Sequence, residues 1–395
     1  MKQSLFAVAF ILGTIPFHSA SAQDDPSKEL SPTALSAQTR ETDGVLSIVK
    51  RNPATPVKDQ SKTGTCWSFS TTSLVESQVI KNKFGAYDLS EMFTVRHIYV
   101  EKAKNYILRQ GHTQFSEGGL GHDMIQAVAN YGAVPEKVYS GLINGEKKHD
   151  HGKLFKDLKR YLDSTLKVKT YPVNQDWLVG YNKILDNYLG PLPENFSFNN
   201  NRYSPVSFAR DALHFNAADY VNITSFTDHA YYKPFVISVP DNFSNGAYYN
   251  LPLAEMISLV KEAIANGYTI LWDTDVSNNG FRHKAGLALN VPESEIIDEK
   301  DFNIAYNEEK YDEKIRQHRF EGLVTQDDHL MHIVGIGKSP EGKTFFMVKN
   351  SWGAVGPLNG YINVSEAYFA INTISLVVPK AAISKSILGK CNIQP

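Results

Sequence analysis

The segment from Gln60 to Ser70 constrains the fold more than any other stretch of this 395-residue chain. It contains Cys66, one of only two cysteines. Gly64 and the small polar residues before Cys66 suit a tight turn, and from Trp67 onward apolar residues recur at roughly helical spacing. Cys66 is therefore expected in the first turn of a helix, where free backbone N–H groups and the helix dipole favour a thiolate.

This setting favours a nucleophilic cysteine over a buried structural one, since the thiolate is the reactive form. Gln60 lies upstream, across the predicted turn, so its side-chain amide can point to the same space as the Cys66 backbone N–H. The two donors together would make an oxyanion hole.

A nucleophilic cysteine needs a base, and the base needs a group that orients it; both are expected far downstream, because such partners meet in the fold. His329 begins one apolar strand and Asn350 ends the next, predicted over Thr344–Lys349, so a hairpin would set the two side by side. His332 competes for the role of base. Strand alternation places it on the face opposite His329, which favours His329.

These residues resemble the active-site motifs of papain-like cysteine peptidases, and within that group the bleomycin hydrolase and aminopeptidase C branch. The resemblance rests on Gln60, on Cys66-Trp67-Ser68-Phe69-Ser70 and on Asn350-Ser351-Trp352-Gly353. It implies Cys66 as nucleophile, His329 as base, Asn350 as its orienter and Gln60 as oxyanion donor. In the family a glycine follows the catalytic histidine by about six residues, and Gly335 fits His329 without a gap. Thr63 departs from secreted papain-like enzymes, which generally have a disulfide-forming cysteine there.

The resemblance also implies substrate contacts. Gly118 and Gly119 match the glycines that hydrogen-bond the substrate backbone beside the scissile bond, and paired glycines allow such an approach because no Cβ intervenes. A plain turn is the alternative. Trp352 is expected to cover the His329–Asn350 contact from water, or to be ordinary core.

The fold that the resemblance implies is α+β: a papain-like, two-lobed structure with a helical lobe, an antiparallel sheet lobe and a cleft between them. Cys66 and His329 lie nearly twice as far apart in sequence as is usual in the family. The excess matches the helical insertion of the branch, placed at about 141–250. Within it, 147–169 reads as a charged helix, 181–203 is rich in Tyr, Asn and Pro, and 207–220 is predicted to be helical.

The N-terminus is typical of a secretory signal peptide over 1–22, with Lys2, an apolar run from Leu5 to Phe17 and Ala20-Ser21-Ala22 at its exit. Export to a bacterial periplasm or beyond is expected. Residues 23–42 read as a flexible lead-in, and the peptidase domain is predicted over 43–395. Two cysteines exclude a disulfide framework.

Composition limits the partners. A formal net charge of −2 gives no reason to propose nucleic acid or a charged membrane surface, and nothing beyond the signal peptide is apolar enough to span a membrane. Peptides are the expected substrates, and the proposed chemistry requires no metal or organic cofactor. His149-Asp150-His151 could bind a metal but is interpreted as a solvated loop. The relatives form hexameric rings, so an oligomer is expected.

The predicted function is peptide-bond hydrolysis, as an aminopeptidase of bleomycin hydrolase type. In the relatives the C-terminus lies in the cleft and offers a carboxylate to a free amino terminus, but Lys380 to Pro395 is a shorter tail here. A tail that reaches Cys66 predicts an aminopeptidase, and one that does not predicts an endopeptidase with an open cleft. A catalytically silent secreted binding protein would fit the same motifs, as would an enzyme of acyl transfer such as transpeptidation.

Overall fold

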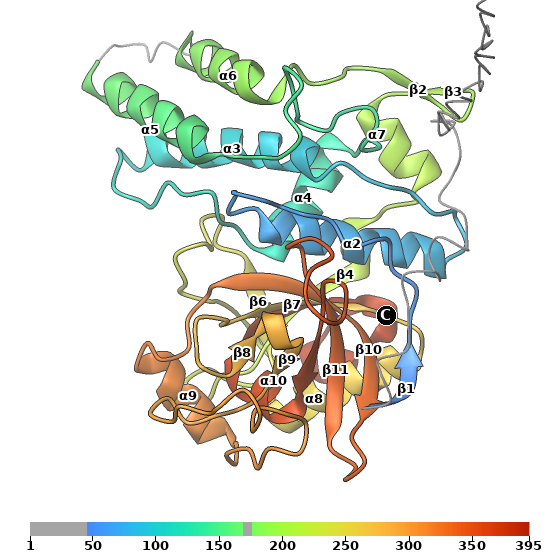
Figure 1. Cartoon of the computed structure of the whole chain (residues 1–395). Helices are drawn as coiled ribbons and strands as arrows, with labels where there is room; N and C mark the ends of the chain where they lie inside the picture. Colours follow the sequence, from blue (N-terminus) through green and yellow to red (C-terminus); the bar gives the residue numbers. More distant parts are fainter. Residues whose placement is uncertain (1–45, 169–175, 395) are drawn as a thin grey trace, which may run out of the picture.

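Helix α2 (Cys66–Lys81) lies between two layers of the computed structural model, with helices on one side and a large sheet on the other (Figure 1). The structure describes residues 46–168 and 176–394, so the predicted signal peptide and lead-in lie outside the described residues. The α+β architecture expected from the sequence, with a helical lobe and a mostly antiparallel sheet lobe, is confirmed. Within the described ranges, no helix is long and apolar enough to cross a bilayer.

The helical lobe is built on α2 and on four further helices with locally encoded boundaries. They are α3 (Glu91–Leu108), α4 (Gly121–Tyr131), α5 (Gly152–Lys167) and α6 (Asp176–Leu189). The segment Leu89-Ser90-Glu91 predicts a capped helix start, and Ser90 does cap α3, because its Oγ accepts a hydrogen bond from the Phe93 N–H at 3.0 Å. Helix α5 buries Leu154, Leu158 and Leu162, a spacing of four that gives it one apolar stripe.

The sheet lobe is an eleven-stranded, mostly antiparallel sheet in the order β5-β6-β4-β13-β7-β10-β11-β12-β9-β8, with β1 paired to β10. The strands are β1 (Ser47–Arg51), β4 (Tyr220–Thr224), β5 (Pro234–Val236), β6 (Ala247–Asn250), β7 (Ile270–Thr274), β8 (Phe281–Arg282), β9 (Leu287–Ala288), β10 (His329–Lys338), β11 (Thr344–Lys349), β12 (Tyr361–Ser365) and β13 (Thr373–Pro379). The predicted strand Thr344–Lys349 is confirmed.

Successive residues of the central strands pack into different cores, as the two-residue period of a strand requires. Leu330 of β10 joins the core around α2, whereas Met331 joins the core around α8 (Leu253–Ala265). Helix α10 (Glu366–Asn372) adds Phe369 to that second core and contacts α9 (Glu313–Glu321). Helix α2 and helix α8 thus cover opposite faces of the sheet.

The segment 141–250 is only partly helical. Helices α5 and α6 pack on α3, but the segment then forms the small sheet of β2 (Phe196–Phe198) and β3 (Asn201–Tyr203) and returns to the large sheet as β4 to β6. The sequence did not predict α6, whose buried Tyr181, Leu185 and Leu189 lie four residues apart. The predicted helix over 207–220 is confirmed only in part: α7 (Pro205–Ser207) continues as a π-helical turn over Phe208–Ala212, and a 3-10 turn covers Ala217–Asp219. The break between them follows from polar residues that favour local caps.

Gly132 follows the last residue of α4, and a substitution there tests whether this position requires glycine. Its φ of +82° is unfavourable for any residue with a Cβ, and a Cβ there would collide with the backbone of Pro205. We expect Gly132→Ala to lower the free energy of unfolding by about 1–3 kcal/mol, measured by urea denaturation.

The matched control is Gly389→Ala in α11 (Lys385–Cys391), where a Cβ has no neighbour within 4 Å. Helix propensity predicts that this change is neutral or stabilising by about 0.5–1 kcal/mol. Equal effects of the two variants would contradict the steric argument.

Candidate active site

Cys66 is the first residue of α2, directly after the turn that Gly64 and Thr65 form. Its side chain is buried, and its sulfur accepts a hydrogen bond from the Leu330 backbone N–H of β10. The Cys66 backbone N–H belongs to the first turn of the helix, where such groups lack a partner within the helix. A substrate oxygen placed there would therefore meet an available donor.

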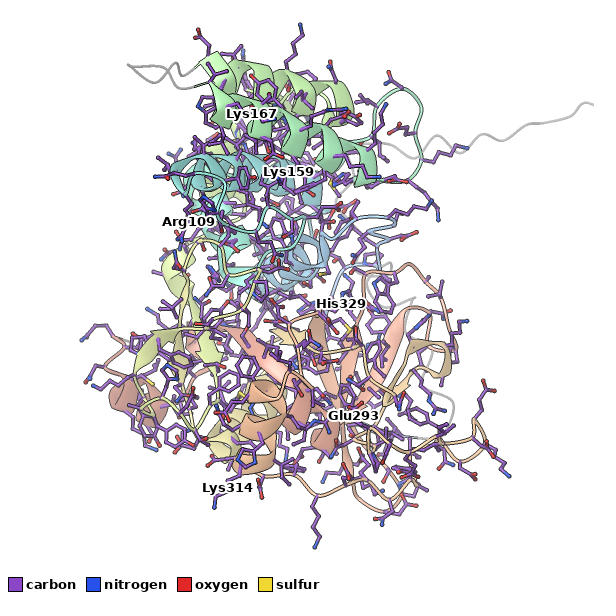
Figure 2. The ribbon with its side chains drawn as sticks, turned by 90° about the vertical axis from the view of Figure 1, so that its left-hand side faces the viewer. Arg109, Lys159, Lys167, Glu293, Lys314 and His329 are labelled. Atoms are coloured by element: carbon purple, nitrogen blue, oxygen red, sulfur yellow. The ribbon has the colours of Figure 1, made fainter. Side chains whose placement is uncertain are left out.

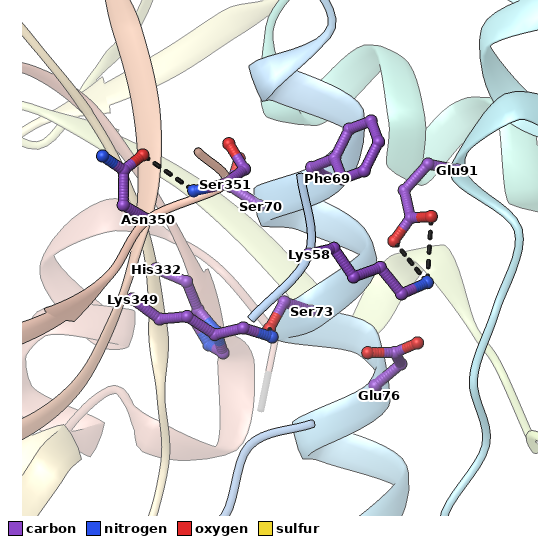
Figure 3. A pocket seen from close by; sticks show the side chains of 10 residues that line it. All are labelled: Lys58, Phe69, Ser70, Ser73, Glu76, Glu91, His332, Lys349, Asn350 and Ser351. Atoms are coloured by element: carbon purple, nitrogen blue, oxygen red, sulfur yellow. Dashed lines mark hydrogen bonds and ion pairs between the residues drawn. The ribbon is translucent and has the colours of Figure 1, made fainter. Parts of the chain in front are cut away.

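His329 lies where the two lobes join (Figure 2). The hairpin of β10 and β11 brings His329 Nε2 to 2.8 Å from Asn350 Oδ1. The same oxygen accepts a hydrogen bond from the Ser351 N–H at 2.7 Å (Figure 3). Because Oδ1 can only accept, Nε2 must carry the ring proton, which leaves the lone pair on Nδ1. The neutral imidazole is thus in the tautomer that can accept a thiol proton at Nδ1.

Trp352 packs against the His329 ring, with centroids 4.7 Å apart and planes tilted by 31°. His283 and Phe281 meet the indole edge-on, at 5.1 and 6.1 Å between centroids. The indole therefore lies beside the histidine, where the sequence predicts it.

Gln60 is tied to the segment that follows Asn350. Its backbone N–H donates to the Ser351 carbonyl at 2.8 Å, and Ser351 Oγ donates to Gln60 Oε1 at 2.6 Å. Gln60 Nε2 donates to the Thr63 carbonyl at 2.7 Å. These contacts use one of the two amide hydrogens and fix the plane of the amide, so the second hydrogen remains for a ligand.

Gly118 and Gly119 run past the first turn of α2, just before α4. The Trp67 indole N–H donates to the Glu117 carbonyl at 3.0 Å, and Glu117 Oε2 accepts from the Gly64 N–H at 2.7 Å. A Cβ on Gly119 would lie 3.2 Å from the Trp67 ring. The two glycines are therefore held flat against the residue that follows Cys66.

His332 points away from Cys66, into a polar pocket behind α2 (Figure 3). Its Nδ1 lies 2.9 Å from Ser73 Oγ, which also accepts from Lys349 Nζ at 2.7 Å. The ring is fully buried, and burial lowers its pKa well below the ordinary value. His332 thus serves the packing of α2 against β10 and does not face the thiol.

The same pocket holds charged residues that sequence reasoning missed. Lys58 Nζ lies 2.8 Å from Glu91 and 2.6 Å from Asp88, while Glu76 Oε1 accepts from the Leu89 N–H at 2.8 Å. Burial raises the pKa values of Glu76 and Glu91 to about 7. The available signal was Glu76 in the interior of α2, whose other charged residue, Lys81, lies at the end of the helix. The network matters to the site because Lys349, which it holds, directly precedes Asn350.

Burial controls the protonation of the reactive pair. It raises the pKa of Cys66 to about 12, with further contributions from Asp327, Asp241 and Asp273, against the opposing Leu330 hydrogen bond. Burial also lowers the pKa of His329 to about 4. Desolvation therefore opposes the helix dipole, which was expected to favour the thiolate, and it favours the thiol with a neutral imidazole. Proton transfer from Cys66 to His329 would form the thiolate.

The segment His149-Asp150-His151 is not the solvated loop that was expected. His151 is 2% exposed and its Nδ1 lies 2.9 Å from the Tyr99 hydroxyl. Over the described ranges, no group of three or more His, Cys, Asp or Glu side chains could hold a metal ion.

The C-terminal tail, as far as Gln394, belongs to the sheet lobe. Cys391 and Ile393 pack into the core around α8, and Lys390 Nζ forms an ion pair with Glu255 at 2.8 Å. Asn392, with φ +56°, ends helix α11 and turns the chain back onto this core. Since α8 covers the face opposite α2, the tail is held away from the side that carries Cys66.

Comparisons with known proteins bear on the family and the fold of the chain. Residues 18–395 match the Peptidase C1-like family. Similar curated proteins include aminopeptidase G of Lactobacillus delbrueckii subsp. lactis, 22% identical over 380 residues (84% of this chain, 83% of that protein). Aminopeptidase C of Lactococcus lactis subsp. cremoris is 24% identical over 381 residues (86% and 84%). The crystal structure of PepW from Lactobacillus rhamnosis HN001 superposes with a TM-score of 0.71 at 19% identity, covering 92% of this chain and 87% of that one.

The pKa of His329 determines the pH below which the Cys66 thiol should lose its reactivity. Between the pKa values of about 4 and about 12, proton transfer from Cys66 to His329 leaves the net proton count unchanged. Alkylation of Cys66 by iodoacetamide through this His329-assisted route should therefore be nearly independent of pH above about 5 and fall as the pH drops through about 4, with a rising limb at higher pH where the unassisted thiolate takes over. The rate of alkylation would be measured by mass spectrometry on samples quenched at set times. Only pH values at which circular dichroism shows the native fold would be used.

The control for that experiment is Cys66→Ala, which reports any labelling of Cys391. An acid limb centred near the ordinary histidine pKa of 6.5 would contradict the buried, neutral imidazole.

Proposed function

The chain belongs to the Peptidase C1-like family of papain-like cysteine peptidases, and from this premise we propose that it is an aminopeptidase whose nucleophile is Cys66. His329 is the base, Asn350 orients it, and Gln60 with the Cys66 N–H stabilises the oxyanion. Gly118 and Gly119 hold the substrate backbone, and Trp352 covers the base. Peptides with a free amino terminus are the proposed substrates.

The proposed reaction follows from the tautomer of His329. Nδ1 takes the thiol proton as sulfur attacks the scissile carbonyl, and the resulting imidazolium is stabilised by the Asn350 Oδ1 contact at 2.8 Å. Gln60 and the Cys66 N–H donate to the developing oxyanion. The imidazolium then protonates the leaving amine, and His329 activates a water molecule that resolves the acyl-enzyme.

The observation that carries this proposal is the 2.8 Å contact between His329 Nε2 and Asn350 Oδ1 beside a cysteine at a helix start. The exopeptidase part is supported by the names of relatives that align over 84–86% of the chain, all of them aminopeptidases.

An endopeptidase remains the second candidate because of one specific observation. The tail packs with α8 as far as Ile393, and α8 covers the sheet face opposite α2. This packing supports a cleft that the described part of the tail does not enter.

Three substitutions test the roles of the two histidines. We expect Cys66→Ala and His329→Ala to lower kcat/KM for aminoacyl-coumarin substrates by at least about a thousandfold, because a nucleophile and its base act as one unit. His332→Gln should stay within about tenfold of wild type, since His332 contacts Ser73 and not the thiol. Fluorescence assays under reducing conditions provide the measurement, with thermal unfolding as a check on folding.

Activity that survives in His329→Ala but not in His332→Gln would move the base to His332. A wild-type protein that hydrolyses neither free nor blocked substrates would support a silent binding protein instead. Amide products formed with an added amine acceptor, in place of free acids, would indicate transpeptidation.

A further inference from the structure

The loop 237–246 between β5 and β6 forms a fixed wall over the two glycines. Asn242 braces it from within, donating to the carbonyls of Ile237 and Gly246 at 2.9 and 3.0 Å and accepting from the Gly246 N–H at 2.8 Å. Ser244 Oγ ties the loop to the start of α4, donating to Asp123 at 2.6 Å and lying 2.7 Å from His122 Nε2. This loop is therefore built to hold one position.

The loop 237–246 places the Asp241 carboxylate against Gly118. A Cβ on Gly118 would collide with the Asp241 carboxylate, so that carboxylate lies directly against the glycine. Asp241 Oδ1 accepts from Ser116 Oγ at 3.2 Å and from Gln114 Nε2 at 3.3 Å. In the part of the chain that the structure describes, Oδ2 accepts no hydrogen bond. A half-buried carboxylate thus presents a free oxygen at the substrate-binding glycine.

Two further carboxyl groups lie near Asp241 and interact with it through their charges. The carboxyl groups of Asp273 and Asp327 lie together, and Asp273 Oδ1 and Asp327 Oδ2 both lack a donor among the described residues. Asp273 is 1% exposed, and its Oδ2 accepts from Ser375 Oγ at 2.9 Å. Two buried acceptors that face each other need a proton between them or a positive charge nearby.

All three acids belong to the surroundings of the thiol. Asp327, Asp241 and Asp273 each raise the pKa of Cys66 by their charge, which requires proximity. A lone metal ion does not fit them, since the described side chains form no metal-binding group. The site is therefore suited to an organic cation that a substrate brings with it.

Lys102 is the nearby cation, and it is already engaged. Its Nζ donates to the Ser116 carbonyl at 3.0 Å and to the Gly118 carbonyl, and it makes no ion pair with Asp241 within the described ranges. One ammonium beside three carboxyl groups leaves the region able to accept another positive charge.

We propose that Asp241, with Asp273 and Asp327 behind it, binds the α-ammonium group of the substrate's first residue. This inference rests on the proposed function and replaces the tail carboxylate, which the family resemblance suggested, with a side chain of the β5–β6 loop. The carboxylate lies against Gly118, so a peptide that binds beside the glycines cannot continue past it. The wall would thereby both end the cleft and attract the free amino terminus.

The experiment compares free and N-acetylated aminoacyl-coumarins on the full chain, its Asp241→Asn variant and a matched control, Asp301→Asn, whose exposed carboxylate makes no hydrogen bond among the described residues. We expect Asp241→Asn to lose about ten- to a hundredfold in kcat/KM on free substrates, the range for a hydrogen bond to a charged group. Its activity on acetylated substrates should not fall, and Asp301→Asn should match wild type. Deleting residues 392–395 should leave the preference for free substrates unchanged.

A further pair of substrates separates the two sources of an ammonium group. Acetylated dipeptidyl-coumarins with lysine or leucine as the first of the two residues should be cleaved equally poorly if the site takes an α-ammonium. A lysine preference that Asp241→Asn abolishes would overturn the assignment in favour of a basic side chain.

Equal hydrolysis of free and acetylated substrates by wild type and Asp241→Asn would overturn the inference while leaving the cysteine peptidase intact. Loss of the free-amine preference on deleting the tail would overturn it as well. Failure of the proposed function has a different signature: no substrate is hydrolysed by wild type, although iodoacetamide labelling shows a folded, accessible Cys66.

Discussion

Helix α2 is buried on nearly every side, between α3 and α4 in the helical lobe and strands β7 and β10 of the sheet. Its small hydroxyl side chains permit this close approach because they bond to nearby backbone: Ser70 Oγ donates to the Cys66 carbonyl at 2.6 Å, and Ser68 Oγ to the Glu91 carbonyl at 3.0 Å. The same burial that anchors the helix places the thiol against β10. The burial of α2 therefore determines both where the Cys66 thiol lies and how apolar its surroundings are.

Burial also assigns different tasks to chemically similar groups. His329 and His332 lie on one strand, yet one meets Asn350 at the rim of the sheet and the other meets Ser73 behind the helix. The buried charges of Lys58, Glu76 and Lys349 stabilise the join between the lobes on the side away from the glycines. Among the described residues, Asp241, Asp273 and Asp327 on the glycine side form no ion pair within 4 Å, and this is one basis for the proposal that Asp241 binds a ligand.

Local signals in the sequence were sufficient for much of the architecture. The Ser90 cap, the strand Thr344–Lys349 and the helix that starts at Cys66 depend on neighbouring residues, and each lies where the sequence predicted it. Helix α6 was missed because its three buried side chains lie in a segment rich in Tyr, Asn and Pro. Its stripe becomes informative only when α3 and α5 are known to cover it.

The sequence by itself determined the fold class and named Cys66, His329, Asn350 and Gln60, since short motifs at strand and helix ends carry that information. Only the tertiary structure decided that burial raises the pKa of the Cys66 thiol, that the described tail packs with α8, and that Asp241 lies against Gly118. The physical reason is the range of the interactions. Caps and periodicity act within a few residues, whereas desolvation and charge clustering depend on segments that meet only after the chain has folded.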